Sequence, residues 1–100
     1  MRGMEITELQ AKAAPIFKKY GFRKVGIFGS RARGDNRVDS DIDLLFSAEG
    51  HPLGFFEKQE VEEELETIFG VHVDLVPDGR VIARMRPSIK EDLKIIYERQ

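Results

Sequence analysis

A glycine–serine pair and two closely spaced aspartates are the residues of this chain best suited to chemistry on a phosphate. Gly29-Ser30 ends an apolar run, and after a spacer of ten residues (31–40) comes Asp41-Ile42-Asp43. Glycine lets a backbone approach a phosphate, whose oxygens can accept hydrogen bonds from the following amides and the serine hydroxyl. In a strand, Asp41 and Asp43 would project from the same face and repel each other without a cation between them. Because Mg²⁺ is commonly held by carboxylates and substrate phosphates, the pattern predicts nucleotidyl transfer.

This segment resembles the minimal nucleotidyltransferases, the MNT family of the polymerase-beta superfamily. Their signature is Gly-Ser, a spacer of about ten residues and Asp-x-Asp, and residues 29–34 also match the family form Gly-Ser-x-Ala-Arg-Gly, with Arg31 at its variable position. The resemblance runs from about Tyr20 to the C-terminus and implies an α/β (α+β) fold, with a small mixed sheet of three to four strands flanked by helices. It also implies that Gly29 and Ser30 hold the triphosphate. Arg33, inside the motif, either binds phosphate or braces the loop on a neighbouring carboxylate.

A third carboxylate is expected on a neighbouring strand. Two cations about 3.5–4 Å apart can clamp the attacking and leaving oxygens of a displacement at phosphorus, and such a clamp needs at least three carboxylates. Asp74 is the only acid in the apolar run 71–76, and it lies where the resemblance would place the third acid of the family. Asp41, Asp43 and Asp74 are therefore the predicted catalytic and metal-binding residues. The alternative is that Asp74 accepts a hydrogen bond from Arg84 or Arg86 at an open sheet edge.

Hydrophobic periodicity predicts the elements that position these residues. Apolar residues at helical spacing predict a helix from Ile6 to Tyr20 with a kink or break at Pro15, and a second helix ends at Gly70. A capping box beginning at Ser88 predicts a last helix whose apolar stripe includes Ile96 and Tyr97. The other expected elements are strands at 22–28, 41–47 and 71–76, a short helical turn at 31–34, a loop at 48–54, and an ambiguous segment at 80–86.

Composition favours a single domain spanning residues 1–100. The chain has no cysteine, is 41% apolar and 34% charged, and has no apolar run near the roughly 20 residues of a membrane span, which favours a cytoplasmic protein. Its net charge of −2 conceals two blocks: residues 18–37 contain seven basic residues and one acid, and residues 57–66 contain six glutamates and one lysine. The basic block flanks the predicted phosphate loop, where it would attract a nucleotide. The acidic block is interpreted as the solvent-facing side of a helix.

The resemblance further implies a reaction and a partner. Free-standing MNT proteins are commonly antitoxins whose partner is a HEPN-family ribonuclease toxin, so the resemblance implies that Mg-ATP, with two Mg²⁺ ions, supplies AMP to a tyrosine hydroxyl of that toxin. Asp74 or the metal would then help to deprotonate the tyrosine. With two tyrosines and no tryptophan, no stacking surface for direct nucleic-acid binding is expected, nor is a membrane partner. Two alternatives remain: a non-catalytic antitoxin that masks the toxin by binding, and a nucleotidyltransferase that acts on a small molecule or an RNA end with a partner chain.

Overall fold

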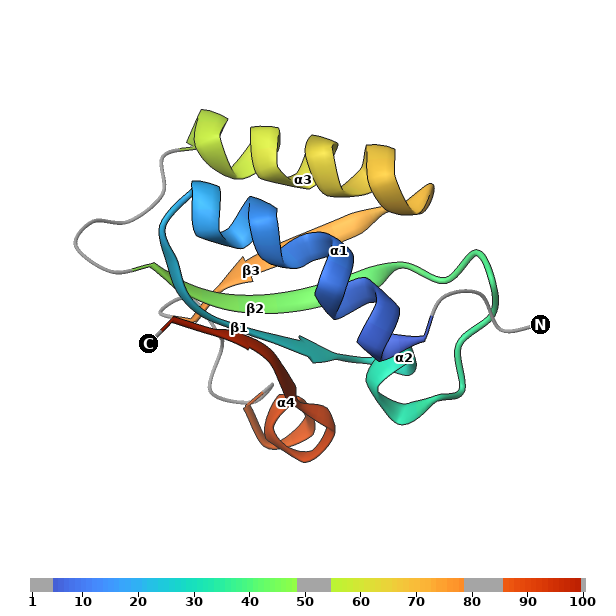
Figure 1. The fold of residues 1–100 in the computed structure, drawn as a ribbon. Coiled ribbons are helices and arrows are strands. Elements are labelled where there is room, and N and C mark those ends of the chain that lie inside the picture. The colour runs from blue at the N-terminus through green and yellow to red at the C-terminus, as the bar shows by residue number, and fades with distance from the viewer. Residues whose placement is uncertain (1–4, 49–54, 79–85, 100) are drawn as a thin grey trace.

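A four-stranded mixed sheet forms the middle layer of the structure (Figure 1), a computed structural model that describes residues 5–48, 55–78 and 86–99. The strand order is β3-β2-β1-β4; β1 is antiparallel to both of its neighbours, and β2 is parallel to β3. This arrangement confirms the predicted mixed sheet. The strands are β1 (Phe22–Phe28), β2 (Ile42–Ala48), β3 (Val73–Pro77) and β4 (Lys94–Glu98).

Helices cover both faces of this sheet (Figure 1). Two long helices lie on one face and the seven-residue α4 lies on the other, while α2 follows directly from the end of β1. None of the helices in the described part of the chain is long and apolar enough to cross a membrane. The helices are α1 (Ile6–Lys19), α2 (Ser30–Arg33), α3 (Phe55–Phe69) and α4 (Arg86–Asp92).

Strand alternation separates the hydrophobic core from the face that carries the aspartates. Ile42 and Leu44 of β2, and Val73 and Leu75 of β3, are each no more than 1% exposed and belong to the core cluster shared with α1 and α3. Successive side chains of a strand point to opposite faces, so the residues between them, including Asp43 and Asp74, face away from α1 and α3.

The first helix does not break at Pro15. α1 is a single helix of 14 residues with Pro15 inside it. Pro15 lies on the exposed side, whereas Ala13, Ile16 and Phe17 pack into the core and hold the helix on both sides of the missing backbone hydrogen bond. Of the two predicted outcomes, a break into two helices is therefore wrong, because the buried face keeps the helix continuous; a kink at Pro15 stays a prediction.

The last predicted helix is also wrong in its extent. α4 ends at Asp92, and Ile96 and Tyr97 lie in β4, which pairs with β1 in the register Lys24↔Glu98 and Gly26↔Ile95. The helical spacing is misleading here, because Ile and Tyr are good strand formers and β1 offers an edge with which residues 94–98 can pair. The predicted loop at 48–54 falls almost entirely on residues outside the described part of the chain, and so does the ambiguous segment 80–86 up to the start of α4.

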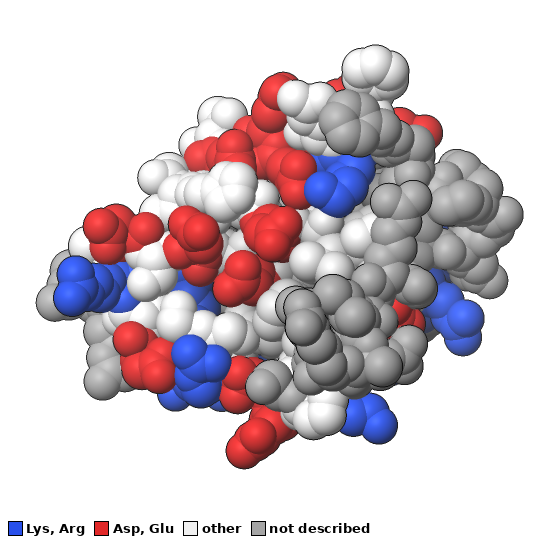
Figure 2. Space-filling view, turned by 180° about the vertical axis from the view of Figure 1, so that it is seen from behind, with Lys and Arg blue, Asp and Glu red and all other residues white. Residues whose placement is uncertain are grey.

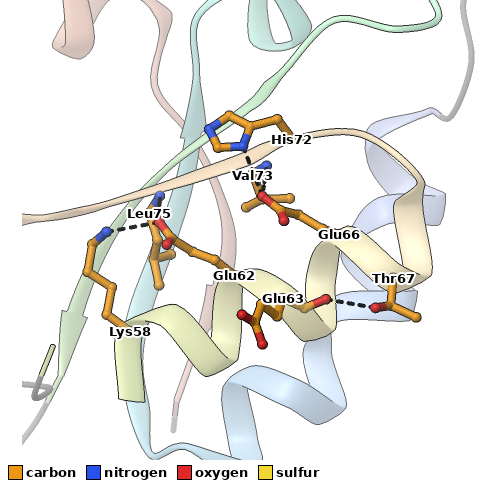
Figure 3. A network of polar contacts seen from close by, with 8 residues as sticks. All are labelled: Lys58, Glu62, Glu63, Glu66, Thr67, His72, Val73 and Leu75. Carbon is orange, nitrogen blue, oxygen red and sulfur yellow. Dashed lines mark hydrogen bonds and ion pairs between the residues drawn. The ribbon is translucent and has the colours of Figure 1, made fainter. Parts of the chain in front are cut away.

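The acidic block of α3 is only partly solvent-facing. Two of its carboxylates reach across to the outer edge of β3 (Figure 3): Glu62 Oε2 accepts from the backbone N–H of Leu75 at 2.9 Å, and Glu66 Oε2 accepts from that of Val73 at 2.9 Å. Lys58 lies 2.9 Å from the same Glu62 oxygen. These side chains occupy donors that an edge strand would otherwise present to solvent or to another chain.

Candidate active site

Gly29 forms the turn between β1 and α2. It is the N-cap of α2 with φ 80° and ψ −157°, a backbone conformation essentially confined to glycine, and its carbonyl accepts from the backbone N–H groups of Ala32 and Arg33, each at 3.1 Å. A Cβ built on Gly29 would lie 2.5 Å from Oδ2 of Asp43. The short helical turn is therefore as predicted, and it places the glycine backbone directly against one of the predicted carboxylates.

The parallel pairing of β2 with β3 brings two of the predicted carboxylates side by side. Asp43 and Asp74 are register partners, on the sheet face turned away from the two long helices, and Asp41 immediately precedes β2. Burial raises the pKa of Asp43, and the nearby Asp74 and then Asp41 raise it further, while His72 and Arg33 act in the opposite direction. The charges of Asp74 and Asp41 thus both act on Asp43, at the end of the sheet where α2 begins.

The donor set suits Mg²⁺, although the carboxylates are not gathered into a closed cluster. Among the residues that the structure describes, no group of three histidine, aspartate or glutamate side chains is close enough together to hold a metal ion as it stands. Mg²⁺ usually takes only one or two protein carboxylates and completes its octahedron with water and substrate phosphates. Register partners that carry like charge, one of them with a raised pKa, fit that requirement, because a cation would relieve their repulsion.

Arg33 braces α2 on the end of α4. Its Nη1 lies 2.7 Å from Oδ2 of Asp92, and its Nε donates to Oδ2 of Asp35 at 3.1 Å. These bonds raise the pKa of Arg33. Of the two interpretations made from the motif, the structure thus contains the contacts of the bracing role, and the phosphate role stays a prediction. Ser30, half-buried in the first turn of α2, stays a predicted phosphate ligand in the same way.

Two residues beside the predicted site make contacts that sequence reasoning missed. His72 Nδ1 lies 2.9 Å from Oε2 of Glu66, so α3 fixes the residue that precedes β3 (Figure 3). Arg31, at the variable position of the motif, is 6% exposed and bonds to backbone carbonyls of the segment before Asp41. Its partners lie seven to nine residues away along an irregular loop, and no sequence periodicity indicates such a contact.

Charges are paired across the fold more than the two blocks suggest. From the basic block, Lys19 lies 3.1 Å from Glu64 and Lys24 lies 3.9 Å from Glu98. Figure 2 shows the face opposite to the one seen in Figure 1; acidic side chains gather on this face, and basic side chains lie mainly toward its margins. Attraction of a nucleotide therefore depends on fewer free positive charges than the sequence count predicts.

Comparison with known proteins assigns the chain to a family. Residues 11–98 match the family model described as "Nucleotidyltransferase domain". The protein adenylyltransferase MntA of Thermococcus cleftensis is 41% identical over 70 residues, which cover 68% of either chain.

Solved structures show the same fold. One is a toxin–antitoxin complex with AMP-PNP, at a TM-score of 0.78 and 20% identity, covering 91% of this chain and 74% of the other. Another is a tri-AMPylated HEPN toxin of Shewanella oneidensis in complex with its MNT antitoxin, at a TM-score of 0.63 and 18% identity, covering 91% and 74%. The fold, the Gly-Ser turn and the matched model together place this chain in the minimal nucleotidyltransferase family, and it is a nucleotidyltransferase.

Proposed function

We propose that this protein transfers AMP from ATP to a tyrosine hydroxyl of a HEPN-type ribonuclease and so acts as the antitoxin of that partner. The observation that carries the proposal is the pairing of Asp43 with Asp74 across β2 and β3, with the Asp43 carboxylate against the Gly29 turn. The similarity of this chain to a protein adenylyltransferase supports a protein as the acceptor. Its fold, shared with the MNT chain beside an AMPylated HEPN toxin, is consistent with AMP as the group transferred.

Asp41, Asp43 and Asp74 are the residues that would hold Mg²⁺. When bound, the ions supply positive charge that offsets the negative charge of the triphosphate during an in-line displacement. Because Gly29 has no Cβ, the Asp43 carboxylate lies directly against the backbone of the turn, and Ser30 follows as a hydroxyl donor for the phosphates. The two ends of the loop 34–41 are held by arginines of α2: Arg33 donates to Asp35, and Arg31 donates to the Ser40 carbonyl.

The reaction forms one bond and breaks one. The tyrosine oxygen of the partner attacks the α-phosphorus of ATP, the bond from that phosphorus to the bridging oxygen breaks, and pyrophosphate leaves. The tyrosine proton passes to a carboxylate, for which Asp74 is suited because its side chain is exposed. An AMP group on that tyrosine would add bulk and negative charge beside the catalytic residues of the ribonuclease.

Labelled ATP tests this proposal. The chain is mixed with Mg²⁺ and the HEPN-type protein encoded beside it, once with ATP labelled at the α-phosphate and once at the γ-phosphate. We expect α label alone on the partner, lost in the Asp41→Asn, Asp43→Asn double variant, whose circular dichroism spectrum should be unchanged. Label from the γ-phosphate would indicate a kinase, and an unlabelled but inhibited partner would indicate masking by binding; either result contradicts AMP transfer.

A further inference from the structure

Arg31 is the only buried charged residue in the described part of the chain. It lies in α2 directly after Ser30, with 6% of its surface exposed. Placing a guanidinium out of water is costly unless its donors are satisfied. Burial lowers the pKa of Arg31, whereas the charges of Asp39 and Asp41 raise it, so the cation and Asp41 act on each other.

The partners of Arg31 are backbone carbonyls of the segment that leads into β2. Its Nε and Nη2 donate to the Ser40 carbonyl at 3.1 and 2.8 Å, and Nη2 also donates to the Val38 carbonyl at 3.2 Å. The same segment is closed on itself, because the backbone N–H of Arg37 donates to the Ser40 hydroxyl at 2.8 Å. The planar guanidinium thus holds two carbonyls in one fixed orientation, which an ammonium on a flexible stem does not do.

Asp41 therefore lies between two fixed points. On one side, the Ser40 carbonyl is held by Arg31; on the other, the backbone N–H of Ile42 donates to the His72 carbonyl at 2.9 Å, at the start of β3. An exposed aspartate just outside a strand would otherwise sample many backbone conformations. The two anchors leave it little freedom relative to Asp43 and Asp74.

We propose that Arg31 is a positioning residue for metal binding: by holding the Val38 and Ser40 carbonyls, it sets the direction in which Asp41 presents its carboxylate beside Asp43. The inference rests on the proposed function only in taking Asp41 as a metal ligand. Residues that orient metal ligands typically affect metal affinity by about 10–100-fold when changed. A purely structural role of Arg31 would instead lower stability and leave metal affinity as it is.

The test measures Mn²⁺ binding directly, by electron paramagnetic resonance or calorimetry, without nucleotide or partner. Arg31→Lys keeps the charge but loses the planar fork, and Arg31→Met loses both. Arg37→Met is the matched control, because Arg37 is exposed and its backbone alone enters the same turn. We expect Arg31→Lys to fold and to raise the Mn²⁺ Kd by about tenfold or more. Arg31→Met should raise the Kd by at least as much, and Arg37→Met should keep a Kd near that of the wild type.

A second measurement separates positioning from folding. In AMP transfer, Arg31→Lys should need a higher Mg²⁺ concentration for half-maximal rate and should recover much of the wild-type rate at saturating Mg²⁺. If Arg31→Lys melts at a lower temperature but keeps the wild-type Mn²⁺ Kd, the positioning role is wrong, and this holds even where Arg31→Met fails to fold. If the Asp41→Asn variant binds Mn²⁺ with the wild-type Kd, the proposed metal site is wrong. Labelling of the partner by the wild-type chain tests the proposed function separately from both results.

Discussion

At the scale of single residues, the contact between Gly29 and Asp43 is the feature on which the site most depends. Gly29 combines two requirements, a positive φ with extended ψ and the absence of a Cβ beside Asp43 Oδ2. Gly21 shares the first requirement, with φ 73°, but nothing lies within 4 Å of where its Cβ would be. A comparison of substitutions at Gly29 and Gly21 therefore distinguishes the effect of backbone strain from the effect of contact with the Asp43 carboxylate.

Gly29→Ala should strain the turn by about 1–3 kcal/mol and displace the Asp43 carboxylate. Misplacing a catalytic group by about 1 Å can cost on the order of 100-fold in rate, so we expect a loss of AMP transfer of that size. The comparison is with Gly21→Ala, which should lose about 1–2 kcal/mol in thermal unfolding yet transfer AMP at close to the wild-type rate. Equal losses of activity in the two variants would mean that the contact with Asp43 has no special importance.

At the scale of elements, α3 closes the exposed edge of β3 with side chains rather than with another strand. Glu62 and Glu66 accept the outward N–H groups of Leu75 and Val73, and so tie the helix to the strand that carries Asp74 (Figure 3). On the opposite side of α3, Glu64 accepts from the Tyr20 hydroxyl, an interaction that raises the pKa of Tyr20 to about 12. The acidic block thus joins α3 to both of its neighbours.

Glu62→Ala should leave the Leu75 N–H without its partner, and we expect a loss of about 1–3 kcal/mol in the free energy of unfolding by urea. Glu62→Gln keeps an accepting oxygen and loses only the ion pair with Lys58, which is worth about 0.3–0.5 kcal/mol. The control is Glu63→Ala, which removes an exposed carboxylate of the same helix. A Glu62→Ala variant as stable as Glu63→Ala would show that water replaces the carboxylate at this edge without cost.

At the scale of the whole molecule, the aspartate site lowers the stability of the fold in the absence of a cation. Burial and the charges of Asp74 and Asp41 raise the pKa of Asp43 in the folded state. The folded protein then binds more protons than the unfolded chain between the two pKa values. Stability must therefore decrease as the pH rises through that window, which begins near the ordinary pKa of 3.8 and extends above it.

Asp43→Asn should accordingly stabilise the protein at neutral pH without divalent ions, by about 0.5–2 kcal/mol, which corresponds to several degrees in Tm for a domain of this size. The advantage should disappear below about pH 4, where Asp43 is protonated in both states. Added Mg²⁺ should raise the Tm of the wild type and not that of the variant. Melting curves measured against pH, with and without Mg²⁺, check this; a difference that stays constant with pH would contradict it.

Local signals were sufficient for much of the fold and for the elements on which the candidate site residues lie. Gly-Ser at the end of an apolar run predicts the turn at Gly29, because few other residues adopt that backbone, and the alternation around Asp43 and Asp74 assigns both to the polar face. The continuity of α1 through Pro15 and the strand at Lys94–Glu98 could not be predicted in this way. In both cases packing against the rest of the molecule outweighs the local preference.

The sequence by itself therefore determined which residue types are available for chemistry on a phosphate and on which elements they lie. Only the tertiary structure decided which of them meet: the parallel register that sets Asp43 beside Asp74, the bonds from Arg31 to the Val38 and Ser40 carbonyls, and the bracing of Arg33 by Asp92. The physical reason is the distance along the chain between the residues that interact. Turn and strand preferences depend on neighbours along the chain, whereas these contacts join segments that come together only once the sheet has formed and its core is buried.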